Sequence, residues 1–153
     1  MKIEIRSRRN GKLLFAHEAE NNTLKITLEA AVRARAYLDG AYLARANLAG
    51  ANLARAYLDG ANLAGANLDG ANLANGEKLK GERPILQLGP LGSRCAYLIA
   101  YVTDKGVMIR AGCFFGTLDA FAGQCTLTHA DNQHGREYQA AIALIKAHAE
   151  IWS

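Results

Sequence analysis

Residues 34–41 read ARAYLDGA, and residues 54–61 repeat the same eight letters twenty positions later. Around these two copies, residues 36–75 run as eight five-residue units: AYLDG, AYLAR, ANLAG, ANLAR, AYLDG, ANLAG, ANLDG and ANLAN. Every unit has Ala at its first position and Leu at its third. A period of five residues and a period of twenty are therefore superimposed, and together they decide the fold of this segment.

An apolar period of five residues excludes an α-helix. Helical positions five apart are separated by about 140° around the axis, so they cannot share one face. Each unit instead places a small inward residue, an outward residue and a large inward residue before two turn-forming residues, which is typical of a very short strand and a bend. The pattern predicts a solenoid whose interior is filled by Ala and Leu.

With this motif, residues 36–75 resemble the pentapeptide-repeat family, whose A(D/N)LXX pattern they follow without a break. The resemblance implies a mainly β fold, a right-handed, four-sided β-helix with four units in each coil. Residues twenty apart would then lie above one another at the roughly 4.8 Å spacing of neighbouring strands, which accounts for the second period. Eight units make two coils, and so short a stack needs its ends covered.

We expect residues 1–35 to cover the first coil. MKIEIRSRRNGKLLFAHE carries alternating apolar residues around Asn10-Gly11, which predicts a hairpin. A cap at Asn22 or Thr23, followed by apolar residues at helical spacing, predicts a helix over 24–34.

The chain changes character after residue 75. Charge, Gly and Pro indicate a connector over 76–84. Within 85–153, apolar runs predict strands over 85–88, 96–103 and 107–115, then a helix capped by Thr117, a loop over 128–135 and a final helix over about 137–152. The expected result is a small α+β domain with two helices on an antiparallel sheet.

Three stretches of this C-terminal segment, LGPLGSR, YVTDKGVMIRAGCFFGTLDAF and HGREYQAAIALIKAHAEIW, look like the extension of some pentapeptide-repeat proteins of bacteriophages and prophages. The likeness covers most of residues 83–152. It implies a phage-borne accessory protein and brings no established activity with it.

Charge and apolar composition indicate the cellular compartment in which we expect the protein. Lys and Arg number 18 against 14 Asp and Glu, and the excess lies in residues 1–35. No run approaches the roughly 18 apolar residues of a membrane helix, so we expect a cytoplasmic chain, in the host cell if it is phage-encoded. Cys95, Cys113 and Cys125 have no CxxC spacing, which indicates reduced thiols of unassigned role.

If residues twenty apart are stacked, the two ARAYLDGA copies form one outward patch in two layers. Tyr and Arg can stack on rings, form charge-assisted hydrogen bonds and are enriched in interface hot spots. The structural alternative is that Tyr rings cover backbone while Arg offsets the stacked Asp pair. The predicted interaction patch consists of Arg35, Tyr37, Asp39, Tyr42, Arg55, Tyr57 and Asp59.

Nucleic acid is not an expected partner. Family members that inhibit topoisomerases imitate DNA with long acidic rods, but this solenoid is short and carries three Asp against two Arg. The basic residues of RSRRNGK could contact phosphates, although basic turns are usually only solvated. These residues are Arg6, Arg8, Arg9 and Lys12.

A small-ligand site is a second possibility in the C-terminal segment. GPLGSR at 89–94 offers backbone N–H groups to an anion, and DNQHGREY at 131–138 supplies polar side chains. The candidate residues for a small anionic, nucleotide-like ligand are Ser93, Arg94, His134, Arg136 and Tyr138.

A nucleophilic or metal site does not follow from the spacing of the C-terminal residues. His129 and His134 are five apart, and Cys113 falls in a strand-like run where thiols are commonly inert. Asp131, Glu137 and Tyr138 would have to complete such a site. We therefore expect no catalytic residue, no metal and no cofactor.

Taken together, the patterns predict a non-enzymatic binding protein that acts by occupancy. It would occupy a host protein, for example in neutralising a host defence, or sequester a small anionic ligand. A DNA-mimic inhibitor is the disfavoured alternative. A homo-oligomer is expected through the exposed end of the solenoid or its Tyr faces, because a two-coil stack is poorly self-sufficient.

Overall fold

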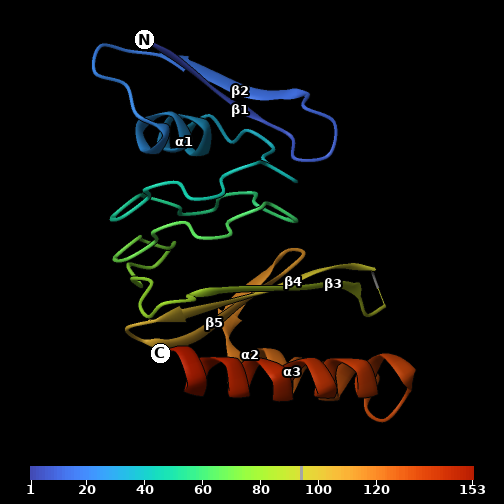
Figure 1. Cartoon of the computed structure of the whole chain (residues 1–153). Helices are drawn as coiled ribbons and strands as arrows, with labels where there is room; N and C mark the ends of the chain where they lie inside the picture. Colours follow the sequence, from blue (N-terminus) through green and yellow to red (C-terminus); the bar gives the residue numbers. More distant parts are fainter. Residues whose placement is uncertain (94) are drawn as a thin grey trace. The chain divides into compact units, whose positions relative to one another are not determined.

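The computed structural model describes residues 1–93 and 95–153, which form two compact units, Met1–Leu79 and Lys80–Ser153 (Figure 1). The division falls inside the segment 76–84. In the described chain, no helix combines the length and apolar character needed to cross a membrane.

The first unit begins with the hairpin and helix that the sequence predicts. Strand β1 (Lys2–Arg6) pairs antiparallel with β2 (Leu13–Glu18), and α1 (Leu24–Arg33) follows. The helix starts after Thr23, whose hydroxyl accepts a hydrogen bond from the Ile26 amide at 3.1 Å. Its inward residues Leu28 and Ala31 are fully buried, so α1 covers apolar surface.

Residues 36–75 wind into two coils in which positions twenty apart pair in parallel (Figure 1). On the second side of the coil, the Leu43 amide donates to the Asn62 carbonyl at 2.9 Å and the Asn62 amide donates to the Ala41 carbonyl at 2.8 Å. Each coil therefore contains four units, and the segment is a β solenoid built from single bridges. The bridged pairs are Tyr37 with Tyr57, Tyr42 with Asn62, Asn47 with Asn67 and Asn52 with Asn72.

Two features of the repeat recur at its corners. The second-position Asn accepts a hydrogen bond from the amide two residues on, as between Asn62 and Ala64 at 3.0 Å. The fifth residue adopts a left-handed backbone, for which Gly is best suited. Glycines hold φ values of 68–71° there in five units: Gly40, Gly50, Gly60, Gly65 and Gly70.

Both coil edges are paired with chain from outside the repeat. At the first coil, the Tyr42 amide donates to the Arg6 carbonyl at 2.9 Å. At the second, the Leu79 amide donates to the Ala71 carbonyl at 2.8 Å, and Glu77 and Leu79 are buried. The first residues of the predicted connector thus cover the end of the stack.

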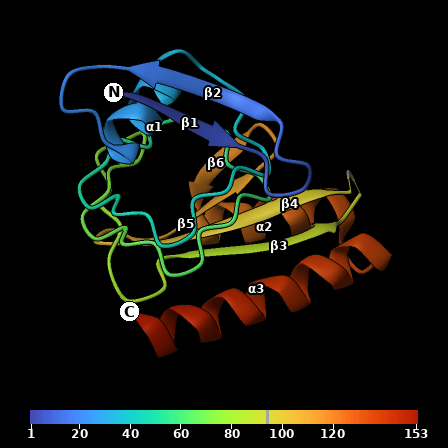
Figure 2. The ribbon, with the colours of Figure 1, turned by 45° about the horizontal axis from the view of Figure 1, so that its top comes forward.

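The second unit is a four-stranded antiparallel sheet in the order β3-β4-β5-β6 with two helices on one face (Figures 1 and 2). Helix α3 runs alongside β3 (Figure 2). The core joins Leu98 and Ile109 of the sheet to Phe121 of α2 and Ile145 of α3. The elements are β3 (Ile85–Leu91), β4 (Ala96–Thr103), β5 (Gly106–Ala111), β6 (Phe114–Thr117), α2 (Leu118–His129) and α3 (Gln133–Trp152).

The expected single strand over 107–115 is wrong. Gly112 has a φ of 57°, which turns the chain after Ala111 and separates β5 from β6. The two strands then pair, with Ala111 opposite Phe114.

The expected loop over 128–135 is also wrong, because most of it is helical. Helix α3 starts at Gln133, where the Asn132 side chain accepts a hydrogen bond from the Gly135 amide at 2.9 Å. A Cβ on Gly135 would lie 2.1 Å from the Ala130 carbonyl oxygen. This Gly therefore allows the two helices to meet in a very short connection.

Candidate functional site

The structure stacks the two copies of ARAYLDGA. The Tyr37 and Tyr57 rings lie with centroids 5.4 Å apart and planes inclined by 36°. They remain 74% and 36% exposed, and Tyr42 on the adjoining side of the coil is 57% exposed. Three aromatic rings therefore face outward on two neighbouring sides of the solenoid.

These tyrosines stand where the repeat otherwise has Asn. In four of the five Asn-containing units, the Asn side chain accepts a hydrogen bond from the backbone two residues on, at 3.0–3.4 Å. A phenol ring cannot reproduce that short local bond, because its oxygen lies at the far end of the ring. The turn geometry of the repeat does not explain why Tyr occupies these positions.

Three arginines interrupt the fifth position in a similar way. Arg35, Arg45 and Arg55 have φ values of 55°, 61° and 63°, and all three are exposed. A left-handed backbone costs a non-Gly residue about 1–2 kcal/mol. Among the described residues, their guanidinium groups form no hydrogen bond or ion pair that would offset this cost.

We define the tyrosine–arginine surface as Arg35, Tyr37, Tyr42, Arg45, Arg55 and Tyr57. Asp39 is exposed beside it, and Asp59 is half-buried in the next coil. The sequence prediction omitted Arg45. The unit AYLAR at 41–45 carries both Tyr at its second position and Arg at its fifth, and this double departure from the repeat was the available signal.

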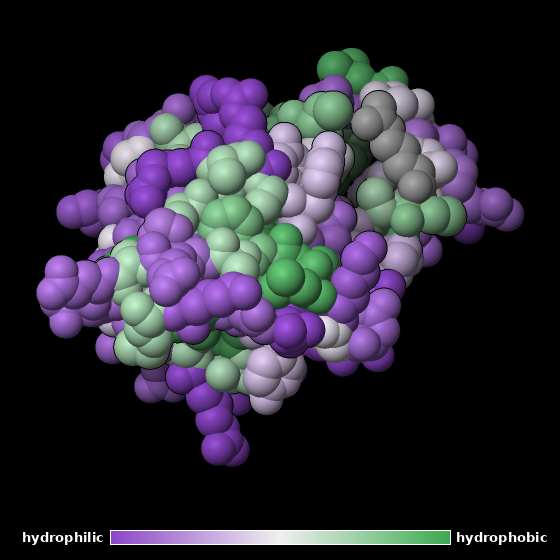
Figure 3. All heavy atoms as spheres, turned by 90° about the horizontal axis from the view of Figure 1, so that it is seen from above, coloured by the Kyte–Doolittle hydropathy of each residue, from purple (hydrophilic) through white to green (hydrophobic). Residues whose placement is uncertain are grey.

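The basic hairpin turn holds one of its arginines, Arg6, in internal hydrogen bonds. The Arg6 Nε donates to Glu4 Oε2 at 2.9 Å, and its Nη1 donates to the Gly11 carbonyl, also at 2.9 Å. This bond with Arg6 holds the pKa of the Glu4 carboxyl below its usual range. The view down on the hairpin shows hydrophilic side chains around a smaller hydrophobic area (Figure 3). Three further basic residues are exposed here: Arg8, Arg9 and Lys12.

The structure places three residues of the predicted anion site, Ser93, His134 and Tyr138, around His129. Ser93 and Tyr138 line a cavity of the second unit, and His134 and Arg136 are exposed but are not among its lining residues. Arg94 lies outside the described residues.

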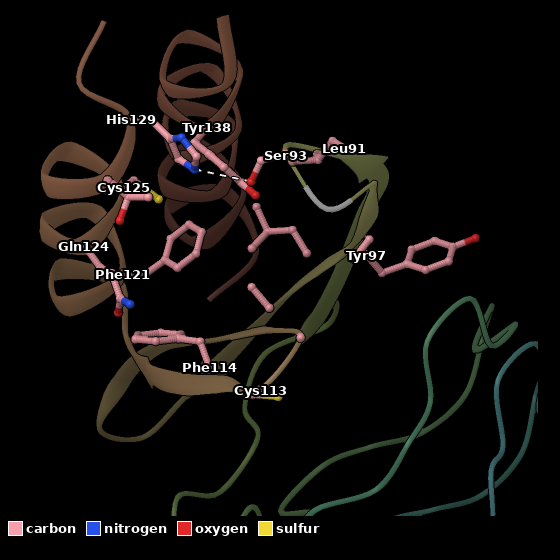
Figure 4. Close-up of a pocket in the computed structure, with 15 residues that line it drawn as sticks. Leu91, Ser93, Tyr97, Cys113, Phe114, Phe121, Gln124, Cys125, His129 and Tyr138 are labelled. Atoms are coloured by element: carbon pink, nitrogen blue, oxygen red, sulfur yellow. Dashed lines mark hydrogen bonds between the residues drawn. The ribbon is translucent and has the colours of Figure 1, made fainter. Parts of the chain in front are cut away.

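The cavity has a volume of about 460 Å³ and lies between the sheet and α2 (Figure 4). Phe114, Phe121 and Cys125 form one side of it, and burial raises the pKa of the Cys125 thiol. The Ser93 hydroxyl lies 3.3 Å from His129 Nε2. The sequence prediction missed this cavity, because its residues come from six elements and the turns between them and show no common spacing.

Two of the three histidines of the second unit, His129 and His134, lie close together. The His129 and His134 ring centroids are 5.5 Å apart, and the Tyr138 ring stacks on His129 at 5.7 Å. Glu137 accepts a hydrogen bond from the Gly92 amide. Within the described residues, no group of three or more His, Cys, Asp or Glu side chains could hold a metal ion.

Comparison with known proteins bears on the solenoid alone. Residues 36–75 match the family described as pentapeptide repeats, in eight copies. Proteins with these repeats are generally structural or interaction proteins. No curated protein and no solved structure matches the chain. The segment is therefore assigned to the class of pentapeptide-repeat solenoids.

Proposed function

We propose that this chain is a non-enzymatic interaction protein that binds another protein through the tyrosine–arginine surface and acts by occupying it. One observation carries the proposal: the three units that have Tyr in place of Asn lie on two adjoining sides of the solenoid, and Arg35, Arg45 and Arg55 stand at the corners that bound these two sides. Because the coil keeps its register at these positions, their side chains are the variable part of a fixed frame.

The chemistry of the surface favours a protein partner that presents carboxylates next to apolar side chains. Arg binds carboxylates through paired hydrogen bonds, and Tyr offers a large ring with few rotatable bonds. Both residues are enriched in hot spots. The stacked backbone fixes the spacing of Tyr37 and Tyr57, so less conformational freedom is lost on binding.

The setting of this activity is also part of the proposal. The likeness of the C-terminal stretches to extensions of phage and prophage proteins favours an accessory protein that acts in the host-cell cytoplasm, for example against a host defence. The resemblance of residues 36–75 to the pentapeptide-repeat family supports a right-handed, four-sided winding of the coils.

The test begins with the mass of the protein purified directly from its cells and measured by native mass spectrometry, which identifies a bound partner. The purified partner is then titrated with the parent chain and with the Tyr37→Ala and Tyr57→Ala variants. We expect at least tenfold weaker binding for each, the range of hot-spot substitutions.

Asn67→Ala is the matched control, because Asn67 lies in the same coil as Tyr57 on a different side, and its side chain accepts a hydrogen bond from the Asp69 amide in the local turn. The complex should keep its affinity in this variant. If neither Tyr substitution weakens the complex, the tyrosine–arginine surface is not the binding site. A measured mass that is a multiple of the mass of this chain would show that the partner is a second copy of the chain and not a foreign protein.

A further inference from the structure

We infer that the cavity of the second unit binds a small, uncharged, planar aromatic molecule with hydrogen-bonding groups along one edge. This site is separate in sequence and chemistry from the tyrosine–arginine surface. It lies wholly within Lys80–Ser153 and does not depend on the function proposed above.

The size and the walls of the cavity suit a ring. Its volume of about 460 Å³ lies within the roughly 300–1,000 Å³ of ligand pockets. Phe114 meets Phe121 at 5.5 Å, and Tyr138 meets Phe121 edge-on at 5.7 Å. A flat aromatic ligand would extend this existing cluster of rings.

The polar groups of the cavity favour an uncharged ligand. Ser93, Gln124, Thr128 and His129 contribute hydroxyl, amide and imidazole groups, which both donate and accept hydrogen bonds. None of the described lining residues is Lys, Arg, Asp or Glu. A charged ligand placed here would therefore lose part of its hydration without gaining an ion pair from these described residues.

The rim of the cavity is held by contacts that need no ligand. Glu137 accepts a hydrogen bond from the Gly92 amide, and Ser93 contacts His129. The Tyr138 hydroxyl fills the space where a Cβ on Gly92 would lie, at 2.0 Å. These three contacts fix Gly92 and Ser93 against the end of α2 and the first turns of α3, so this part of the rim is in place without a ligand.

The test measures ligand-detected saturation-transfer NMR on the full chain with three uncharged probes: indole, benzimidazole and adenine. We expect at least one to bind with a Kd below about 1 mM, in the range of small fragments. Thr128→Trp places a large side chain in the cavity and should weaken that binding at least tenfold. Leu127→Trp is the matched control, because Leu127 is the adjacent residue of α2, is 89% exposed and does not line the cavity.

Ala111→Phe fills the cavity from the opposite wall. It tests the same point if Thr128→Trp does not fold, and circular dichroism shows whether each variant is folded. The inference is overturned if none of the three probes receives saturation, or if both filled variants bind as the parent does. Tenfold tighter binding of indole-3-acetate or adenosine monophosphate than of the uncharged rings would also overturn it, because the site would then select an anion.

Discussion

The solenoid and the second unit are stabilised in different ways. In residues 36–75 each position within the five-residue unit has one structural task, and residues twenty apart repeat it in the next coil. In Lys80–Ser153 the core joins side chains from six elements without any period. In the solenoid an unusual residue is easy to recognise, because the other units show which residue normally occupies that position. In the second region only the three-dimensional contacts show what a residue does.

The first test of this comparison shortens one buried Leu side chain of the solenoid. Leu48→Ala should lower the free energy of unfolding by about 3 kcal/mol, because Leu48 is fully buried and the stacked backbone cannot collapse into the gap. Leu63→Ala is the control at the same position of another unit, where the side chain is only half-buried. A loss of about 1 kcal/mol is expected there, and urea titration measures both. Equal losses would mean that the burial of the individual side chain does not set what each Leu contributes.

The second test compares two glycines inside helices. Gly135→Ala should lower the free energy of unfolding by about 2 kcal/mol, because the new Cβ would meet the Ala130 carbonyl. Gly123→Ala should raise it by up to about 1 kcal/mol, since a Cβ there meets nothing within 4 Å and Ala favours the helix. Thermal unfolding of the two variants gives the sign of each change. Stabilisation by both would show that helix propensity alone governs this unit.

These glycines show where the sequence stops being informative. The repeat excluded a helix by its period, and its resemblance to the pentapeptide-repeat family implied four units in each coil, the stacking of Tyr37 with Tyr57 and the need for end cover. It could not predict that Gly112 separates two strands or that Gly135 joins two helices. Those roles depend on contacts between segments that share no pattern. The cavity was missed for the same reason.

A smaller effect is expected at the corners of the coil. Gly70→Ala should lower the free energy of unfolding by about 1 kcal/mol, because Gly70 has a φ of 69° and an L-residue is strained there. No atom lies within 4 Å of the new Cβ, so the change tests backbone strain without a clash. Calorimetry that shows no loss would imply that the corners accept any residue, and the three arginines would then need no special explanation.

The smallest predicted effect concerns the turn bond of Asn. Asn62→Ala should lower the free energy of unfolding by about 0.5–1 kcal/mol, because it removes the hydrogen bond from the Ala64 amide. Tyr42→Asn, on the same side of the coil, introduces the same local bond and should raise the free energy of unfolding by a similar amount. Paired urea titrations check the two signs, and a loss in both variants would show that the Tyr42 ring stabilises the fold.

The central claim is that tyrosines on the solenoid serve binding and not folding. Its most direct test is a variant with Tyr37, Tyr42 and Tyr57 all replaced by Asn, the residue that the repeat uses elsewhere at this position. We measure its free energy of unfolding and its affinity for the partner side by side. The prediction is stability within about 1 kcal/mol of the parent, because the gained turn bonds offset the lost ring contact, and affinity reduced at least a hundredfold. A variant that loses several kcal/mol of stability and still binds the partner as the parent does would contradict the claim.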